Sequence, residues 1–329
     1  MGQNSKIEWT HHTFNPWRGC TKVSAGCANC YAERQSLRNP KVLGIWGDEG
    51  NRVIAAESYW QQPLKWNTAA KAAGERHRVF CASLADIFED RPELLEPRCR
   101  LYDLIADTPS LDWLLLTKRP ENFKRLIPRD WGRAPRENVW LGVSVEDQKN
   151  ADLRIQPLME FPARVKFLSA EPLLGRIVLP EEFLLPDFAD DDPRHTKRWV
   201  IVGGESGPKA RPMHPDWARQ LRDDCDPLGV PFHFKQWGEW LPYDMDAQPP
   251  FWSSSADGSI IDGHIFPDTL SDGDEVDGWL SGDLAGDDLQ VVYRKVGKKA
   301  AGRLLDGREW NEFPGSSSEA STPEAVEKS

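Results

Sequence analysis

Three cysteines near the amino terminus are the residues best suited to chemistry in this chain of 329 residues. Cys20, Cys27 and Cys30 follow the spacing C-x6-C-x2-C and make up half of the six cysteines. The short gap before Cys30 lets two thiols face one point, and the longer gap, with Ser24 and Gly26, lets the backbone wrap around a bulky group. A closed zinc site normally has four ligands. Three thiolates suit a cubane iron–sulfur cluster whose fourth iron is left open for chemistry.

A second set of polar residues follows six short apolar runs farther along the chain. Its members are Asp86, Lys118 with Arg119, Ser144 with Glu146, Glu171, Glu205 and Lys235. A charged residue after one buried strand can simply mark the exit of that strand to water. Six such ends in succession, with both signs of charge, favour a site, because parallel barrels place their chemistry at the carboxyl ends of their strands.

The elements that must position the cysteines lie directly on either side of them. Residues 6–17 alternate apolar and polar side chains and end near a proline, which predicts a first strand that feeds the cysteine loop. Residues 31–38 are helix formers, so the last cysteine lies at a helix N-terminus whose amides favour an anionic cluster. Residues 41–73 show a weaker pattern and are predicted to be a long loop with short helical pieces.

The six apolar runs and the stretches between them predict the rest of the fold. The runs cover 78–83, 112–117, 138–144, 164–169, 198–204 and 230–235, and amphipathic stretches cover 93–106, 120–127, 147–159 and 215–225. Strands that recur about every 30 residues with helical stretches between them indicate repeated βα units and a parallel sheet. We therefore expect an α/β protein with a full or partial parallel (βα) barrel.

The charge distribution divides the chain. The net charge is −11, but residues 244–288 hold twelve Asp or Glu and no Lys or Arg, so the remainder sums to about +1. A nearly neutral main body does not exclude nucleic acid as a partner. We expect a barrel over residues 1–243, an acidic C-terminal insertion or flap over 244–290, a strand and basic helix that pack on the barrel over 291–314, and a disordered tail over 315–329.

Cysteine usage predicts the compartment. Six unevenly spaced cysteines without a signal-peptide pattern indicate a reducing cytoplasm and no disulfide framework. Cys81, Cys99 and Cys225 are predicted to be buried hydrophobic residues, and most of the tryptophans to be packing residues. No apolar stretch approaches the roughly 18 residues of a membrane helix, so no membrane partner is expected.

Several motifs together resemble one family. They are Ile7–Thr10, Asn15–Trp17, Gly19–Ser24, Cys27–Ala32, Gly203–Gly207, Phe234–Gly238 and Gly297–Arg303. These motifs resemble a phage-associated, three-cysteine-motif family of unknown function that is related to radical SAM enzymes. The resemblance covers nearly the whole chain except the acidic insertion and the tail.

The resemblance implies a barrel of radical-SAM type and two cofactors. A 4Fe–4S cluster would be held by Cys20, Cys27 and Cys30, with S-adenosylmethionine (SAM) on the fourth iron. A reductant such as flavodoxin or ferredoxin would supply the electron that yields a 5′-deoxyadenosyl radical. The chain departs from the commoner pattern in having six residues, not three, between the first two cysteines, and in the Gly-Gly-Glu turn after the sixth strand rather than the second.

The strand-end groups can then be assigned to the two ligands. We assign Ser83 and Asp86 to the SAM amino group, Lys118 or Arg119 to the SAM carboxylate, Ser144 and Glu146 to the ribose, and Glu171, Glu205 and Lys235 to the substrate as catalytic candidates. The first assignment follows because the second strand should lie beside the strand that carries the cysteine loop.

Two alternatives to SAM chemistry remain open at this point. The three cysteines with His11 or His12 would make a structural zinc site in a protein that only binds nucleic acid or another partner. A cluster could also serve sensing or electron transfer without SAM. The substrate of an enzyme is open as well: nucleic acid or a nucleotide, a peptide and a small molecule all fit.

Overall fold

The computed structural model describes residues 5, 7–185, 196–243, 275–276, 279–282 and 291–315. Most of the acidic segment 244–290 and the tail beyond residue 315, where the flap and the disordered tail were predicted, lie outside the described residues. Within the described part of the chain, no helix combines the length and apolar composition that crossing a bilayer requires.

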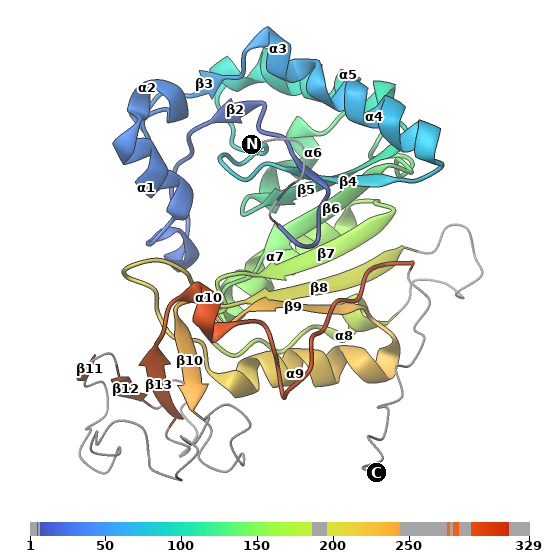
Figure 1. Ribbon diagram of the computed structural model, residues 1–329. Coiled ribbons are helices and arrows are strands. Elements are labelled where there is room, and N and C mark those ends of the chain that lie inside the picture. Colours follow the sequence, from blue (N-terminus) through green and yellow to red (C-terminus); the bar gives the residue numbers. More distant parts are fainter. Residues whose placement is uncertain are drawn as a thin grey trace.

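A seven-stranded parallel sheet in the order β1-β4-β5-β6-β7-β8-β9 forms the centre of the molecule. The strands are β1 (His12–Thr13), β4 (His77–Cys81), β5 (Leu111–Thr117), β6 (Val139–Ser144), β7 (Val165–Ala170), β8 (Lys197–Gly203) and β9 (Phe232–Gln236). Every neighbouring pair is parallel. The sheet curls into a half-barrel (Figure 1), which confirms the predicted α/β fold in its partial-barrel form.

Helices connect the strands and cover the outside of the sheet (Figure 1). The longer ones are α4 (Gln62–Ala73), α5 (Leu95–Asp107), α7 (Gln148–Glu160) and α9 (Pro215–Cys225), and the shorter ones are α3 (Glu57–Trp60), α6 (Phe123–Leu126) and α8 (Glu181–Leu184). The Asp147 side chain caps α7 by accepting from the Asn150 N–H at 2.9 Å. The predicted helices at 93–106, 147–159 and 215–225 are thus confirmed.

Residues 41–73 were predicted to be a long loop with short helical pieces, and the twelve-residue helix α4 is longer than that prediction allows. Its second half is rich in alanine and lysine, which are strong helix formers, and Gly74 ends it with a φ of +69°. Trp66 and Ala70 form its buried side. Pro63 and Trp66 in its first half obscure this pattern in the sequence.

The predicted first strand over residues 6–17 is also shorter than expected. Strand β1 has two residues, and the chain then leaves the sheet to pair as β2 (Trp17–Arg18) with β3 (Val53–Ile54). The Asn15 side chain accepts from the Leu84 N–H at 2.7 Å and donates to Ser83 Oγ at 3.1 Å. These side-chain bonds replace the backbone ladder, and Pro16 has no N–H with which to continue it.

The interior of the half-barrel, below the carboxyl edge of the sheet, is a packed aromatic core. Its buried members include Trp9, Phe80, Trp140, Phe167 and Trp199. The Trp199 ring lies 6.1 Å from both Trp9 and Trp140, in edge contacts. This packing leaves the carboxyl edge of the sheet as the place for chemistry, and it agrees with the prediction that most tryptophans are packing residues.

The C-terminal segment lies against the free edge of β9. The Phe234 N–H donates to the Trp310 carbonyl at 3.0 Å, and Arg78 of β4 lies 4.1 Å from the ring of Phe313. Arg303 forms an ion pair with Glu8 at 3.1 Å. Residues 303–313 therefore reach from β9 to the opposite side of the half-barrel and cover its open side.

A small antiparallel sheet precedes this segment, in the order β10-β13-β12-β11. Its strands are β10 (Trp240–Tyr243), β11 (Glu275–Val276), β12 (Trp279–Gly282) and β13 (Val291–Lys295), and helix α10 (Lys298–Ala301) follows. Strand β13 lies between β10 and β12 in this sheet.

The three cysteines outside the amino-terminal loop differ in burial. Cys81 and Cys225 are buried as predicted, whereas Cys99 of α5 is exposed. Cys99 lies on the outer side of α5. The prediction rested on residue type alone, which does not show on which side of a helix a residue lies.

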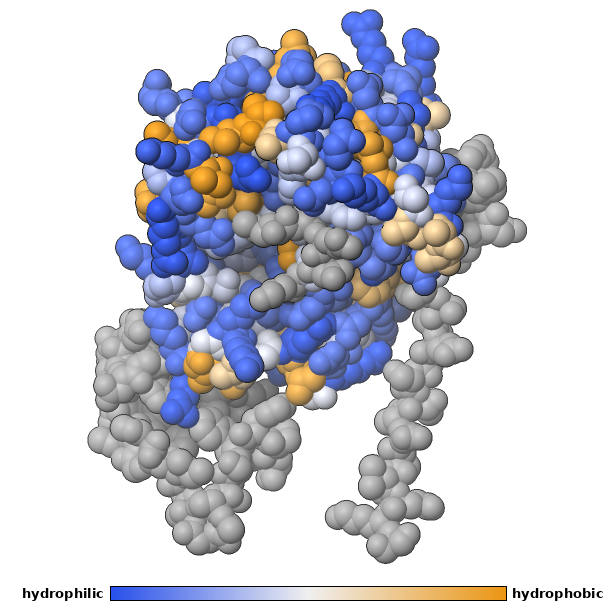
Figure 2. Space-filling model, turned by 45° about the horizontal axis from the view of Figure 1, so that its top comes forward, coloured by the Kyte–Doolittle hydropathy of each residue, from blue (hydrophilic) through white to orange (hydrophobic). Residues whose placement is uncertain are grey.

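Hydrophobic side chains are also exposed on the segment that follows the cysteine loop. Leu37, Val42 and Ile45 are exposed on and after α1 (Tyr31–Arg38) and α2 (Pro40–Leu43). Orange side chains gather at the upper left of Figure 2, on the side where α1, α2 and β3 lie in Figure 1. Hydrophilic side chains surround them.

His233 of β9 is a titratable group inside the aromatic core. Its ring lies 6.1 Å from Trp199 and 5.6 Å from Phe313, and neither ring nitrogen has a hydrogen-bond partner among the described residues. Burial, followed by the charges of Arg303 and Lys235, lowers the pKa of His233 from 6.5 to about 3. The folded state therefore disfavours the protonated, charged form of His233, whereas the unfolded chain does not.

We expect His233 to make stability depend on pH. Because the folded pKa is depressed, the contribution of this residue is complete above about pH 6.5 and is lost as the pH falls towards 3, at about 1.4 kcal/mol per pH unit. Urea unfolding between pH 7.5 and 5 should show a shallower loss of unfolding free energy in His233→Leu than in the wild type. Parallel slopes in the two proteins would contradict a neutral buried histidine.

Candidate functional site

The cysteine loop, residues 19–30, connects β2 to α1 and lies beside the carboxyl ends of the parallel strands (Figure 1). Its residues Ala25–Cys27 form one short 3-10 turn, and α1 begins directly after Cys30, as predicted. The thiols of Cys20, Cys27 and Cys30 are all free, and each residue is half-buried. The loop has little regular structure, so contacts with other parts of the chain must fix its shape.

Each thiol has a different immediate environment. Cys20 Sγ donates to the Thr21 carbonyl at 3.4 Å and accepts from Arg119 Nη1 at 3.6 Å. Cys27 Sγ lies 3.8 Å from the Ser24 hydroxyl. Burial, with the charge of Asp86, raises the pKa of Cys20 to about 12. Without a metal, Cys20 is therefore a neutral thiol. A bound metal would displace the thiol proton.

Three thiols on one loop are the donor set that a cubane cluster uses when its fourth iron is left open. Among the described residues, no three His, Cys, Asp or Glu side chains are grouped so that they could hold one metal ion. Zinc needs its sulfur ligands about 2.3 Å from one point. In a cubane each thiolate binds its own iron, so the cysteines surround the cluster without converging on a point.

The histidines of the zinc alternative have other partners. His11 Nδ1 accepts from the Arg78 N–H at 2.9 Å, and His12 Nε2 lies 3.1 Å from His77 Nδ1. His77 begins β4, at the amino end of the sheet. Both histidines therefore lie at the end of the sheet opposite to the strand ends that hold the cysteine loop.

Asp86, predicted to bind the SAM amino group, is occupied by protein groups. Its buried carboxylate accepts from the Thr117 hydroxyl at 2.7 Å and, each at 3.0 Å, from the N–H groups of Phe88 and Lys118 and from Arg119 Nη1. A carboxylate offers about four acceptor positions. Asp86 therefore fixes the turn after β5 and orients Arg119.

Arg119, predicted as a partner for the SAM carboxylate, belongs to a buried network beneath the loop. Its Nη2 donates to the Thr21 carbonyl at 2.7 Å and lies 3.8 Å from Glu89. Glu89 in turn pairs with Arg52 at 2.6 Å, and Arg52 Nη2 donates to the Thr21 hydroxyl at 2.9 Å. Arg52 and Glu89 were not predicted from the sequence, because no local pattern marks two residues that pair across 37 positions.

Glu146, predicted to bind the ribose, is fully buried and holds the loop from the end of β6. Its Oε1 accepts from the Ser24 hydroxyl at 2.7 Å, and its Oε2 from Arg154 at 2.6 Å. Lys118 Nζ lies 3.5 Å away. A Cβ on Gly26 would lie only 2.4 Å from Glu146, so glycine is required where the loop crosses this carboxylate.

Glu205, in the Gly-Gly-Glu turn after β8, holds the loop from a third strand. Its carboxylate accepts from Asn29 Nδ2 at 3.0 Å and from Arg211 at 2.6 Å, and Arg211 also donates to the Ala25 carbonyl at 3.0 Å. Burial raises the pKa of Glu205, but the bonds from Arg211 and Asn29 outweigh it and hold the pKa below its usual value. The preceding Gly204 has no room for a side chain, because a Cβ would lie 1.8 Å from the Trp237 carbonyl oxygen.

The two serines contribute mainly through the backbone. The Tyr31 hydroxyl, next to Cys30, donates to the Ser83 carbonyl at 2.6 Å. The buried Ser144 gives its carbonyl to Arg154 at 2.8 Å. Ser83 thereby ties the start of α1 to the end of β4.

Glu171, Lys235 and Lys118 are the predicted strand-end charges that stay partly open. Lys235 Nζ pairs with Glu171 at 2.7 Å, and the Ser169 hydroxyl donates to the same carboxylate at 3.2 Å. The side chains of Lys235, Glu171 and Lys118 are 24%, 14% and 19% exposed, respectively. These three side chains are more exposed than those of Asp86, Arg119, Glu146 and Glu205.

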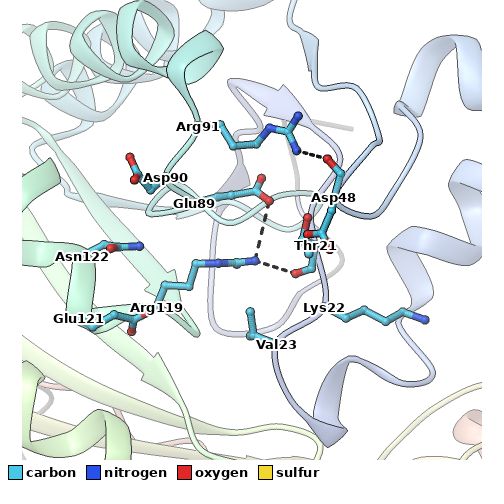
Figure 3. Close-up of a pocket in the computed structure, with 10 residues that line it drawn as sticks. All are labelled: Thr21, Lys22, Val23, Asp48, Glu89, Asp90, Arg91, Arg119, Glu121 and Asn122. Carbon is cyan, nitrogen blue, oxygen red and sulfur yellow. Dashed lines mark hydrogen bonds and ion pairs between the residues drawn. The ribbon is translucent and has the colours of Figure 1, made fainter.

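A separate open pocket of about 470 Å³ lies on another side of the loop. It is lined by the loop residues Thr21–Val23, by Asp48, by residues 89–91, and by Arg119, Glu121 and Asn122 after β5. Figure 3 shows Arg119 extending towards Thr21 and Glu89 at this pocket.

Comparison with known proteins gives one family and a set of distant structures. Three mutants of spore photoproduct lyase, one with bound AdoMet and a dinucleoside spore photoproduct, are similar at 12–13% identity and TM-scores of 0.44–0.45, over 69% of this chain and 75% of theirs. A likeness of this size does not by itself assign a fold or an activity. No curated protein matches. The family described as "Protein of unknown function (DUF5131)" matches residues 4–314, nearly the whole chain, and the protein therefore belongs to this family.

Proposed function

We propose that this protein is a radical SAM-type enzyme in which Cys20, Cys27 and Cys30 hold a 4Fe–4S cluster and SAM occupies the open iron. The observation that carries the proposal is three free thiols on one loop, fixed to three strand ends at the carboxyl edge of a parallel half-barrel. When bound, the cluster supplies the electron for reductive cleavage of SAM. The site of action would be cytoplasmic, with a reductant such as flavodoxin or ferredoxin.

The residues of the chain divide into two roles under this proposal. Asp86, Glu146 and Glu205 position the loop, because their oxygens are already bonded within the protein. Lys118, which lies near the loop and is partly exposed, is then the better partner for the SAM carboxylate. The Glu171–Lys235 pair remains as the catalytic candidate that faces the substrate.

The substrate class that we favour is a nucleotide or nucleic acid. Lys235 follows β9 at the same edge of the sheet and retains exposure, and its ammonium group can pair with phosphate. The aromatic core below this edge leaves the ligands no deeper position.

Anaerobic reconstitution of the full chain with iron and sulfide tests the proposal. We expect a brown protein with about four irons per chain that releases 5′-deoxyadenosine when SAM and dithionite are added. A colourless protein that retains one tightly bound zinc would contradict the proposal. A cluster without any 5′-deoxyadenosine would contradict the SAM chemistry and leave electron transfer or sensing.

A further inference from the structure

We infer that Arg119 sets the reduction potential of the proposed cluster through its hydrogen bond to Cys20, and that it does not bind SAM. This inference rests on the proposed function. The Arg119 guanidinium donates from Nη1 to Cys20 Sγ at 3.6 Å, and its Nη2 donates to the carbonyl of the next residue, Thr21, at 2.7 Å. One side chain thus contacts a ligand thiol and the backbone beside it.

The position of this guanidinium is fixed from behind. Asp86 Oδ2 accepts from Nη1 at 3.0 Å, and the Arg119 N–H donates to the Thr117 hydroxyl at 2.8 Å. That hydroxyl is itself bonded to Asp86 at 2.7 Å. Arg119 is only 7% exposed, so turning towards another ligand would leave Asp86 as a buried carboxylate without its counter-charge.

The other two thiols have neutral groups as neighbours. Cys27 lies beside the Ser24 hydroxyl at 3.8 Å. Burial raises the pKa of Cys30, and the backbone of Ala32 and Glu33 in the first turn of α1 opposes that rise. Cys20 is therefore the thiol with a charged donor in direct contact.

The consequence for a cluster follows from electrostatics. Reduction adds negative charge to the cluster and its thiolates, so a buried cation that donates to one sulfur stabilises the reduced form more than the oxidised form. Among the described charges, Arg52 and Arg119 balance Asp86 and Glu89 in this network. Loss of the Arg119 charge would leave excess negative charge beside the cluster and make reduction harder.

The test is a redox titration of the reconstituted full-length chain, monitored by electron paramagnetic resonance. We expect the midpoint potential to fall in the order wild type, Arg119→Lys, Arg119→Gln, because lysine keeps the charge but loses the fork of donors. Iron and sulfide content should be equal in the three proteins. Lys22→Gln is the matched control: it removes one positive charge from the same loop, but Lys22 is 46% exposed and pairs with Glu33. Its potential should match the wild type.

An unchanged midpoint in Arg119→Gln, or an equal shift in Lys22→Gln, would overturn the inference while the cluster assignment stands. Failure of the wild type to take up a cluster would instead overturn the proposed function. Should Arg119→Gln alone lose the cluster, the shift in Arg119→Lys decides, and an unshifted midpoint there overturns the inference.

Discussion

Replacement of Cys30 by Ala should abolish both the visible absorbance of the reconstituted protein and its release of 5′-deoxyadenosine. Three thiols are the minimum that leaves one iron open, and the nearby carboxylates of Glu146 and Glu205 are already bonded within the protein. Cys81 and Cys225 are buried in the core and cannot substitute. Iron and sulfide analysis after anaerobic reconstitution measures the loss, which should be at least tenfold.

Cys99→Ala provides the control for this experiment. Cys99 is exposed on α5, outside the loop, so its removal should leave iron content and 5′-deoxyadenosine release at wild-type levels. Full cluster occupancy in Cys30→Ala would sink the ligand assignment. Equal losses in both variants would show that the loss reflects general thiol damage rather than ligation.

The sheet was predictable because its strands are buried on both faces. Strands such as β5, β6 and β8 are near-continuous apolar runs. Such runs are typical of parallel strands that are covered on both faces. The helices between them carry their own periodicity. The sequence prediction failed where side-chain bonds replace the backbone ladder, as at Asn15, and where the first half of a helix obscures its pattern, as in α4.

The partners of the strand-end carboxylates were not predictable. The sequence correctly places charged groups at one edge, but Ser24 and Glu146 are 122 positions apart and Asn29 and Glu205 are 176 apart. A carboxylate that binds a distant loop and one that waits for a ligand look identical in a single sequence. Only the fold shows that these two carboxylates are already occupied.

This arrangement has a structural logic. The cysteine loop has one short turn of regular structure, so its own backbone bonds cannot fix it. Buried carboxylates at the ends of rigid strands give it fixed partners instead. The positions of the three thiols therefore depend on the sheet, and a change at a strand end should disturb both stability and cluster binding.

Replacement of Glu146 by Ala should lower the unfolding free energy by about 3–5 kcal/mol, because breaking a buried pair leaves one charge uncompensated. Glu146 is 0% exposed, and Arg154, its partner at 2.6 Å, is 5% exposed. The substitution also removes the acceptor of the Ser24 hydroxyl. Urea unfolding of the protein without its cofactors measures the change.

Two further variants serve as controls. One keeps a hydrogen-bond acceptor at position 146 without the charge, and the other removes an acidic residue from an exposed ion pair. Glu146→Gln keeps an acceptor for Ser24 but loses the charge, so its loss should be smaller than that of Glu146→Ala. Asp130→Ala breaks the exposed pair with Arg136 and should cost less than about 1 kcal/mol. If Glu146→Ala cost no more than Asp130→Ala, the buried carboxylate would not hold the loop, and the positions of the thiols would need another explanation.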